Sequence, residues 1–163
     1  MNISLFYRST EDAIDWQYTQ TGEYWTAVNI PEVKVNGHQI SADLNIESVP
    51  LIGFISKVDL DYTFLDLSHN TGEYRYASNY LIHQFISSFD YNLFFGLSQS
   101  WFIRYENPAQ FSPRWLTDTV INLPIWRFNT SFSIENIMDV SYQDELGFDA
   151  SGRWMKFGLQ FQY

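Results

Sequence analysis

The last residues of the chain, "GRWMKFGLQFQY", alternate between two kinds of side chain with a period of two. Met155, Phe157, Leu159, Phe161 and Tyr163 share one parity with Arg153, whereas Trp154, Lys156, Gly158, Gln160 and Gln162 have the other. Successive side chains of a β-strand point to opposite faces, so this pattern predicts a strand with one apolar face. Such a face has to be covered by protein or by lipid.

The same alternation recurs along the chain and predicts about eight strand-like segments. Within residues 51–67, apolar residues share the even parity at Ile52, Phe54, Val58, Leu60, Tyr62 and Phe64, and the odd parity carries Gly53, Lys57, Asp59, Asp61 and Thr63. Residues 93–106 place Leu93, Phe95, Leu97, Trp101, Ile103 and Tyr105 on one parity, and for residues 79–91 we expect Leu81, Phe85 and Phe89 to face outward. Within residues 26–46 the apolar parity shifts, and Gly37 lies at the shift, which predicts a β-bulge there.

The connections between these segments alternate between long and short. Residues 9–24, 68–78, 106–113 and 139–151 are long and polar, whereas 47–50, 90–92 and 123–124 are short. Long loops at one end and tight turns at the other are typical of outer-membrane barrels. The sequence therefore predicts an all-β, antiparallel up-and-down transmembrane barrel. In it the long loops are extracellular and the C-terminus is periplasmic.

Lipid is a better cover for the apolar faces than a protein core. Aromatic residues make up 19% of the chain, and several lie near strand ends, as interfacial girdles require: Trp25, Tyr105, Trp115, Trp126, Trp154 and Tyr163. The opposite faces carry charges such as Lys57, Asp59 and Asp61, which a polar lumen accepts. The alternative is a soluble barrel of the lipocalin type, whose surface should contain more than the three lysines found here.

Composition and motifs give little support to other classes of function. The net charge of −10 argues against nucleic-acid binding, and the absence of cysteine excludes disulfides and thiolate metal sites. The start, "MNISLFYRST", does not have the pattern of a signal peptide, so we expect an export signal to have been removed or the chain to be part of a longer one. His38, His69 and His83 are scattered, and Glu11, Asp12 and Asp15 are interpreted as a solvated loop. No catalytic motif is recognised, so we expect neither an enzyme nor a cofactor or metal.

Residues 133–163, "SIENIMDVSYQDELGFDASGRWMKFGLQFQY", resemble the C-terminal end of TonB-dependent outer-membrane receptors. In that family an "ENLFD-xx-Y" element precedes a loop, "GR" and an alternating strand that ends in an aromatic residue. The stretches "LFYRSTEDAIDW", "AVNIPEVKVNGHQI" and "LIHQF" match family habits in the same order and spacing. The nearest subgroup is that of cobalamin- and siderophore-type receptors, such as those of Bacteroidota.

The resemblance implies that residues 1–163 are a C-terminal transmembrane β-barrel segment, about eight strands of a 22-stranded type of barrel, without the plug domain. The implied function is import of a scarce large nutrient: cobalamin, a siderophore or a glycan. The implied partners are outer-membrane lipid, the remaining strands and plug of the receptor, and the barrel assembly machinery. The alternative is a small autonomous barrel, or a barrel fragment that is a substrate of that machinery. An autonomous barrel would require the first and last strands to pair.

Two sets of residues are candidates for function within this resemblance. Aromatic residues near the long loops could stack on a flat ligand, or they could belong to an interfacial girdle; they are Trp16, Tyr18, Tyr24, Trp25, Tyr74 and Tyr76. The last strand resembles the assembly signal of outer-membrane barrels, in which an edge strand offers its backbone and alternate side chains supply specificity. The residues of this signal are Phe157, Gly158, Leu159, Phe161 and Tyr163.

Overall fold

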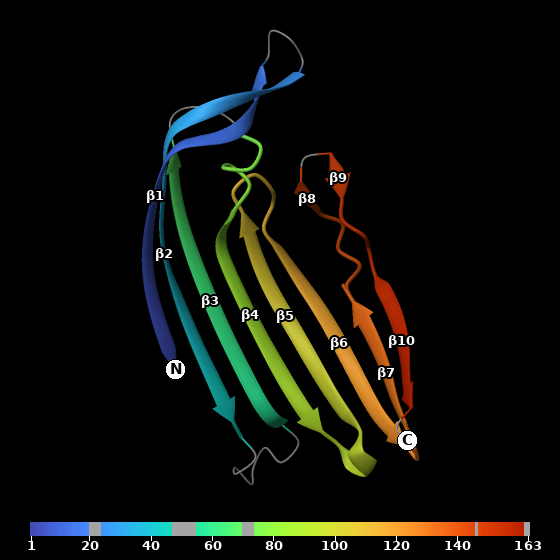
Figure 1. Ribbon diagram of the computed structural model, residues 1–163. Helices are drawn as coiled ribbons and strands as arrows, with labels where there is room; N and C mark the ends of the chain where they lie inside the picture. Colours follow the sequence, from blue (N-terminus) through green and yellow to red (C-terminus); the bar gives the residue numbers. More distant parts are fainter. Residues whose placement is uncertain (20–23, 47–54, 70–73, 146, 162–163) are drawn as a thin grey trace.

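The computed structural model describes residues 1–19, 24–46, 55–69, 74–145 and 147–161. Eight long strands form one antiparallel sheet in which each strand pairs with the next along the chain, and a small two-stranded sheet lies apart (Figure 1). The long strands are β1 (Asn2–Thr19), β2 (Tyr24–Asn45), β3 (Ile55–His69), β4 (Leu81–Asn92), β5 (Ser98–Pro108), β6 (Arg114–Ile125), β7 (Phe128–Glu135) and β10 (Trp154–Phe161). The small sheet pairs β8 (Gln143–Glu145) with β9 (Phe148–Asp149). This confirms the predicted up-and-down antiparallel fold.

The register separates the sheet into two chemically different faces. A row of side chains, Ile3, Ile40, Tyr62, Phe85, Tyr105 and Trp115, crosses the first six strands on one face. On the same face Ile121, Phe132 and Phe157 continue the apolar surface across the last three strands. We call this the apolar face. The other face, here the polar face, carries the row Asp43, Asp59, Ser88, Phe102 and Asp118. The outward placement of Phe85 and Phe89 is thereby confirmed.

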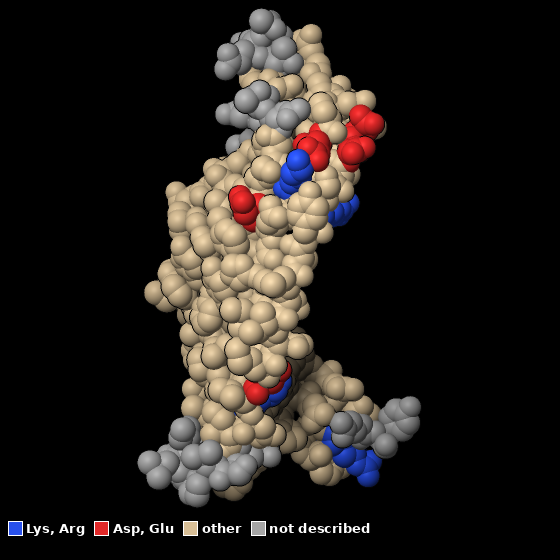
Figure 2. Space-filling view, turned by 90° about the vertical axis from the view of Figure 1, so that its left-hand side faces the viewer, with Lys and Arg blue, Asp and Glu red and all other residues tan. Residues whose placement is uncertain are grey.

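The apolar face is exposed rather than folded into a core. Phe157 is 71% exposed and Leu5 81% exposed, and only five apolar residues among those described are buried: Ile30, Val58, Tyr74, Pro108 and Leu116. Seen from the β1 side, Lys, Arg, Asp and Glu gather toward the two ends, and the middle of the surface is free of them (Figure 2). The lipocalin-type arrangement, with the apolar parity enclosed, is therefore wrong for the described strands. Among the helices of the described residues, none has the length and apolar character needed to cross a membrane.

The two outermost strands leave the sheet open. In the described part of the chain, β1 pairs with β2 alone and β10 pairs with β7 alone, so the eight strands do not close on themselves. Each outer strand therefore has one edge whose backbone groups are unpaired within the sheet. An autonomous eight-stranded barrel is not the arrangement seen here.

The predicted bulge at Gly37 is wrong. The pairing of β2 with both neighbours runs through Gly37 without interruption, opposite Phe6 on one side and Leu65 on the other. A Cβ atom on Gly37 would lie 2.4 Å from the Phe6 ring and 2.7 Å from the carbonyl oxygen of Phe64. Glycine is thus required because the Phe6 ring lies over the backbone. The parity shift in the sequence has another cause: between Gly37 and the hairpin, apolar side chains such as Val35 and Leu67 lie on the polar face.

The first long loop is mostly a β-hairpin. β1 and β2 remain paired as far as Thr19 and Tyr24, well beyond the predicted strand ends, and the hairpin bends over the end of the sheet (Figure 1). Asp12 has a φ of 52°, and it lies across from Pro31, which has no amide hydrogen to donate. The polar composition of residues 9–24 concealed this extension, because these residues contain no long apolar stripe from which a strand could be predicted.

The tight turns also differ in position from the prediction. Residues 90–92 belong to β4, and the turn is formed by Leu93–Leu97, where the Leu93 amide donates to the Leu97 carbonyl at 2.8 Å. Residues 123–124 belong to β6, and the next turn lies at Trp126, with a φ of 56°. The predicted turn at 47–50 and the start of the strand at 51–54 lie outside the described residues. Both described turns lie at the end of the sheet where β10 ends, opposite the hairpin and β8–β9 (Figure 1).

Candidate functional site

Asp15 fastens the hairpin to the connection between β3 and β4. It is only 4% exposed, and its carboxylate accepts hydrogen bonds from the backbone amides of Trp16, Tyr76 and Ala77 at 2.6, 3.2 and 2.7 Å. The Arg75 amide adds a bond to the Trp16 carbonyl at 2.9 Å. The interpretation of Asp15 as a solvated loop carboxylate is therefore wrong, because it binds the backbone of a distant loop.

The structure brings three of the predicted ligand-binding aromatics together around Arg75. The rings of Tyr18 and Trp25 meet edge to face with 5.6 Å between centroids, and the Arg75 guanidinium lies 5.9 Å from the Trp25 centroid and 5.7 Å from that of Tyr76. Both distances fall in the range of cation–π attraction. We call these four residues the mouth cluster.

The other predicted aromatics lie around this cluster in different environments. Trp16 and Tyr24 are 43% and 58% exposed on the hairpin, whereas Tyr74 is 5% exposed, with its ring edge-on against His69 at 5.0 Å. Tyr76 is 59% exposed. The accessible aromatic surface therefore belongs to the hairpin and Tyr76, and Tyr74 supports it from beneath.

The β8–β9 segment is attached to the same loop. Arg75 forms an ion pair with Glu145, and Glu145 holds the pKa of the Arg75 guanidinium above its usual value. The Asn79 side-chain amide donates to the Asp144 carbonyl at 2.8 Å. The hairpin, the loop before β4 and the β8–β9 segment are thus linked in series at the end of the sheet with the long loops.

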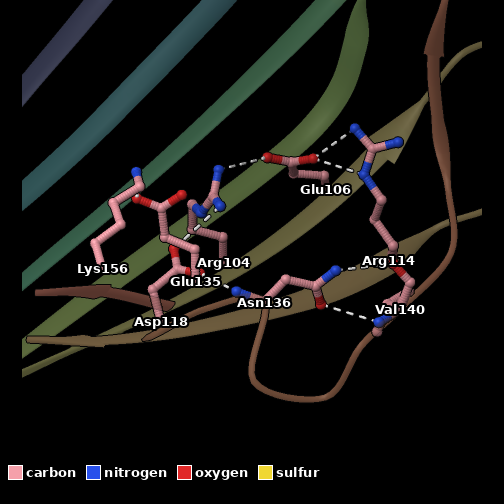
Figure 3. Close-up of polar contacts among 8 residues, drawn as sticks. All are labelled: Arg104, Glu106, Arg114, Asp118, Glu135, Asn136, Val140 and Lys156. Carbon is pink, nitrogen blue, oxygen red and sulfur yellow. Dashed lines mark hydrogen bonds and ion pairs between the residues drawn. The ribbon is translucent and has the colours of Figure 1, made fainter. Parts of the chain in front are cut away.

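The polar face below them carries a network of ion pairs (Figure 3). Arg114 contacts Glu106 at 2.7 Å, and both side chains are 7% exposed; Arg104 contacts Asp118 at 3.1 Å and Glu106 at 3.5 Å. Arg114 also pairs with Asp144, so it ties β6 to the β8–β9 segment. Buried charges of this kind are stable only when paired and hydrogen-bonded.

Tyr142 completes the attachment of the segment. Its ring lies 4.2 Å from the Arg114 guanidinium, and Arg114 donates to the Gln143 carbonyl at 2.9 Å. Burial, with a smaller effect of Asp144, raises the pKa of the Tyr142 phenol. The phenol therefore stays neutral at pH 7 and acts as an aromatic surface for Arg114.

The element "ENIMD" that follows β7 forms a tight turn. Asn136 has a φ of 51°, its side-chain amide donates to the Val140 carbonyl at 2.9 Å, and its side-chain oxygen accepts from the Val140 amide at 2.9 Å. Asp139 accepts from the Arg153 amide at 2.8 Å, and a Cβ atom on Gly152 would lie 2.7 Å from the Asp139 carboxylate. The residues of this motif, and the "GR" after it, are therefore explained by the geometry of the turn.

A hollow of about 780 Å³ opens on the polar face beside this network. Its wall includes Arg104, Asp118, Glu135, Trp154 and Lys156, and the last of these pairs with Glu135. Trp154 was predicted to join an interfacial girdle. It lies opposite Glu135 in the register of β10 and β7, on the polar face, and lines the hollow instead. In the described residues, no three His, Asp or Glu side chains are placed to hold a metal ion.

The arginines and carboxylates of this network were not among the predicted site residues. Arg104 and Glu106 alternate with the apolar residues Ile103 and Tyr105 on β5, which was an available signal, whereas β6 shows no such alternation between Arg114 and Asp118. Their pairing across strands depends on the register. The two strand histidines lie on the apolar face: His38 and His83 flank the Phe64 ring, each with 5.1 Å between centroids. The three histidines do not form one cluster.

The predicted assembly-signal residues lie on the edge strand β10. Phe157, Leu159 and Phe161 are 71%, 60% and 50% exposed on the apolar face, and Tyr163 lies outside the described residues. Gly158 is on the polar face, where a Cβ atom would lie 2.4 Å from the Ser131 hydroxyl. A larger residue at this position would therefore have to displace the Ser131 hydroxyl on the neighbouring strand.

Comparison with known proteins agrees with this architecture. No protein-family model matches the chain, and no curated protein matches it in sequence. Among solved structures, the chain is similar to the pyoverdine outer membrane receptor FpvA from Pseudomonas aeruginosa PAO1, bound to pyoverdine. The TM-score is 0.68 at 16% sequence identity. The match covers 99% of this chain and 27% of the receptor chain, so the chain spans about a quarter of that receptor's length. The fold is that of part of an outer-membrane receptor barrel.

Proposed function

We propose that the chain is the C-terminal part of a TonB-dependent outer-membrane receptor that imports a scarce large nutrient. The observation that supports this most strongly is the combination of one apolar and one polar face on a sheet that stays open at β1 and β10. In a bilayer every backbone group must be paired, so a membrane-spanning sheet has to close. The open edges therefore require further strands, which the rest of a larger barrel would supply.

The remaining partners follow from the same proposal. Lipid covers the apolar face, and a plug occupies the space inside the polar face. The end with the hairpin and β8–β9 faces the outside of the cell, and the end with the short turns faces the periplasm. The edge of β10, with Phe157, Leu159 and Phe161, is the site at which the barrel assembly machinery engages the chain.

The mouth cluster is the proposed ligand contact, together with Trp16 and Tyr24. Exposed aromatic rings favour a large ligand with a flat or ring-containing surface, which includes cobalamin, siderophores and glycans. Tyr74 would hold the loop in place beneath the ligand rather than contact it, because it is 5% exposed.

The test is a deletion of the gene in the bacterium that carries it, followed by growth with each nutrient class in limiting supply. We expect growth to fail for one class, and to fail equally when the energising inner-membrane complex is removed. Normal growth of the deletion strain on all three classes, when the parent strain carries the chain inserted in its outer membrane, would favour the alternative of a barrel or fragment with no transport role.

A further inference from the structure

The hairpin of β1 and β2 has two different faces beyond Asp12. One face contains Asp15 and Ile30, which are 4% and 1% exposed, and Asp15 fastens it to the loop before β4. Side chains alternate between the faces of a strand, so the residues next to Asp15 belong to the opposite, outward face. There the register places Ile14 across from Asn29, Trp16 across from Ala27, and Tyr18 across from Trp25. We call these six residues the hairpin track.

The β1 side of the hairpin track is a short exposed row. Ile14 is 75% exposed, and Trp16 and Tyr18 are both more than two-fifths exposed. Ala27, directly across from Trp16, is too small to cover the indole ring. Alternate residues of a strand are about 6.7 Å apart, so the row from Ile14 to Tyr18 is about 13 Å long. Because Asp15 holds the other face on the loop, this row is fixed in its outward position.

The charges around the hairpin track disfavour an anionic ligand. Residues 9–32 contain no lysine or arginine, and the carboxylate of Glu11 is exposed. Arg75, whose guanidinium lies beside the track, is paired with Glu145, and Lys34 just below the hairpin is likewise paired with a glutamate. A negatively charged ligand on the track would therefore meet carboxylates, and residues 9–32 offer it no cation.

We propose that the hairpin track binds an uncharged, linear glycan. The inference rests on the proposed function and selects one of its three nutrient classes for the same site. A sugar ring has an apolar C–H face that can stack on an aromatic ring, and its hydroxyl groups can donate to carboxylates and to amides such as that of Asn29. A chain of sugar rings can follow the row from Ile14 to Tyr18, whereas a compact siderophore or a cobalamin would cover only part of it.

Titration of the whole receptor, purified with all its strands from outer membranes, tests this inference. The uncharged probes are maltohexaose, cellohexaose, mannohexaose and xylohexaose. The comparison probes are an oligogalacturonate of equal length, a ferric hydroxamate siderophore and cyanocobalamin. We expect at least one uncharged oligosaccharide to bind, more tightly as its chain lengthens from a disaccharide to a tetrasaccharide, and we expect the oligogalacturonate not to bind.

Variants of the track separate stacking on this row from binding elsewhere. Trp16→Ala and Tyr18→Ala should each raise the Kd of the uncharged oligosaccharide about tenfold, as for the loss of one aromatic contact. Trp126→Ala is the matched control, because it removes an 84% exposed ring at the other end of the sheet and should leave the Kd unchanged. Heat-modifiable gel migration shows that each variant is inserted.

Three results would overturn the inference. In the first, no uncharged oligosaccharide binds, the oligogalacturonate binds equally well, or Trp16→Ala and Tyr18→Ala leave the Kd unchanged. In the second, the siderophore or cyanocobalamin binds instead and the same variants weaken its binding. In the third, Trp16 and Tyr18 resist hydroxyl-radical oxidation in native outer membranes before any glycan is added, which would mean that another protein covers the track. Each of these results leaves nutrient import intact, whereas normal growth of the deletion strain on every nutrient class contradicts the proposed function itself.

Discussion

Replacement of Leu60 by arginine is the sharpest test of which face meets lipid. Leu60 lies on the apolar face of β3 between Ala42 and Ser87, and the spanning part of this strand runs from about Ile55 to Phe64. Ten residues at about 3.3 Å each, tilted by about 40°, give a height of about 25 Å, which is the height of the apolar band of outer-membrane barrels. Leu60 is therefore close to the middle of the membrane.

The cost follows from this depth. Arginine on the lipid face at the midplane destabilises a barrel by about 2–4 kcal/mol, and the cost falls to about 0–1 kcal/mol near the interfaces. Because each 1.4 kcal/mol is a factor of ten, we expect Leu60→Arg to lower the inserted-to-uninserted ratio by about 30- to 700-fold. Its neighbours on the two adjacent strands, alanine and serine, offer no charge with which an arginine could pair.

Asp61→Arg is the matched control, because it changes the next residue on the same strand but on the polar face. It lies between Ser41 and Ile86, beside the carboxylate of Asp59, so a positive charge there meets water and an opposite charge. We expect its effect on insertion to stay within about 1 kcal/mol, as for exposed ion pairs. The assay is heat-modifiable gel migration of the native polypeptide from outer membranes, supported by protection from added protease. Equal losses for the two variants would refute the assignment of the faces.

Three further outcomes are expected. Asp15→Asn should release the hairpin, because it weakens charged hydrogen bonds that each contribute about 1.5–3 kcal/mol. Protease added to intact cells should then cut the hairpin faster in this variant than in the control variant Glu11→Gln. Equal rates of cleavage would contradict the role of Asp15. Gly37→Val should destabilise the sheet by about 1–3 kcal/mol, since the added atoms meet the Phe6 ring and a backbone carbonyl. Urea unfolding of the chain in vesicles measures this change. If the ring is the cause, adding Phe6→Ala to the same chain should restore part of the lost stability. Removal of Tyr163 should slow assembly in a reconstituted assay with the assembly machinery, and unchanged kinetics would count against a signal role for the last strand.

The sequence was sufficient for the fold class because the alternation on β3, β5, β7 and β10 needs only the local period of two. Keeping one parity on one face then excludes register shifts by an odd number of residues, since a slip by one residue would move every apolar side chain of a strand to the polar face. The prediction of strand ends failed on the hairpin, where no apolar parity marks one face of the strands over their whole length. The hairpin has no continuous apolar stripe, so the strand ends at Thr19 and Tyr24 could not be found from hydrophobicity.

The turns were misplaced for a related reason. Pro124 suggested a turn, but it lies beyond Asn122, where the pairing of β6 with β5 ends, and such an edge position tolerates proline. The left-handed positions fall on Phe95 and Trp126 instead. Large aromatic residues are unusual with a positive φ, so no residue preference pointed to them. The ion-pair network of Arg104 and Arg114 was not predictable, because it depends on contacts between strands and the distant β8–β9 segment.

The residues that carry the family resemblance and those that could carry a ligand are different groups with different physical roles. Asn136, Asp139 and Gly152 build a turn through hydrogen bonds and close approach, which any receptor of this shape would need whatever its ligand. The mouth cluster is instead built from aromatic rings around Arg75, and the Arg75–Glu145 ion pair connects it to the β8–β9 segment, which follows that turn along the chain. The resemblance therefore informs the barrel and its closure, whereas under the proposed function selectivity for a ligand would come from the hairpin and the loop before β4.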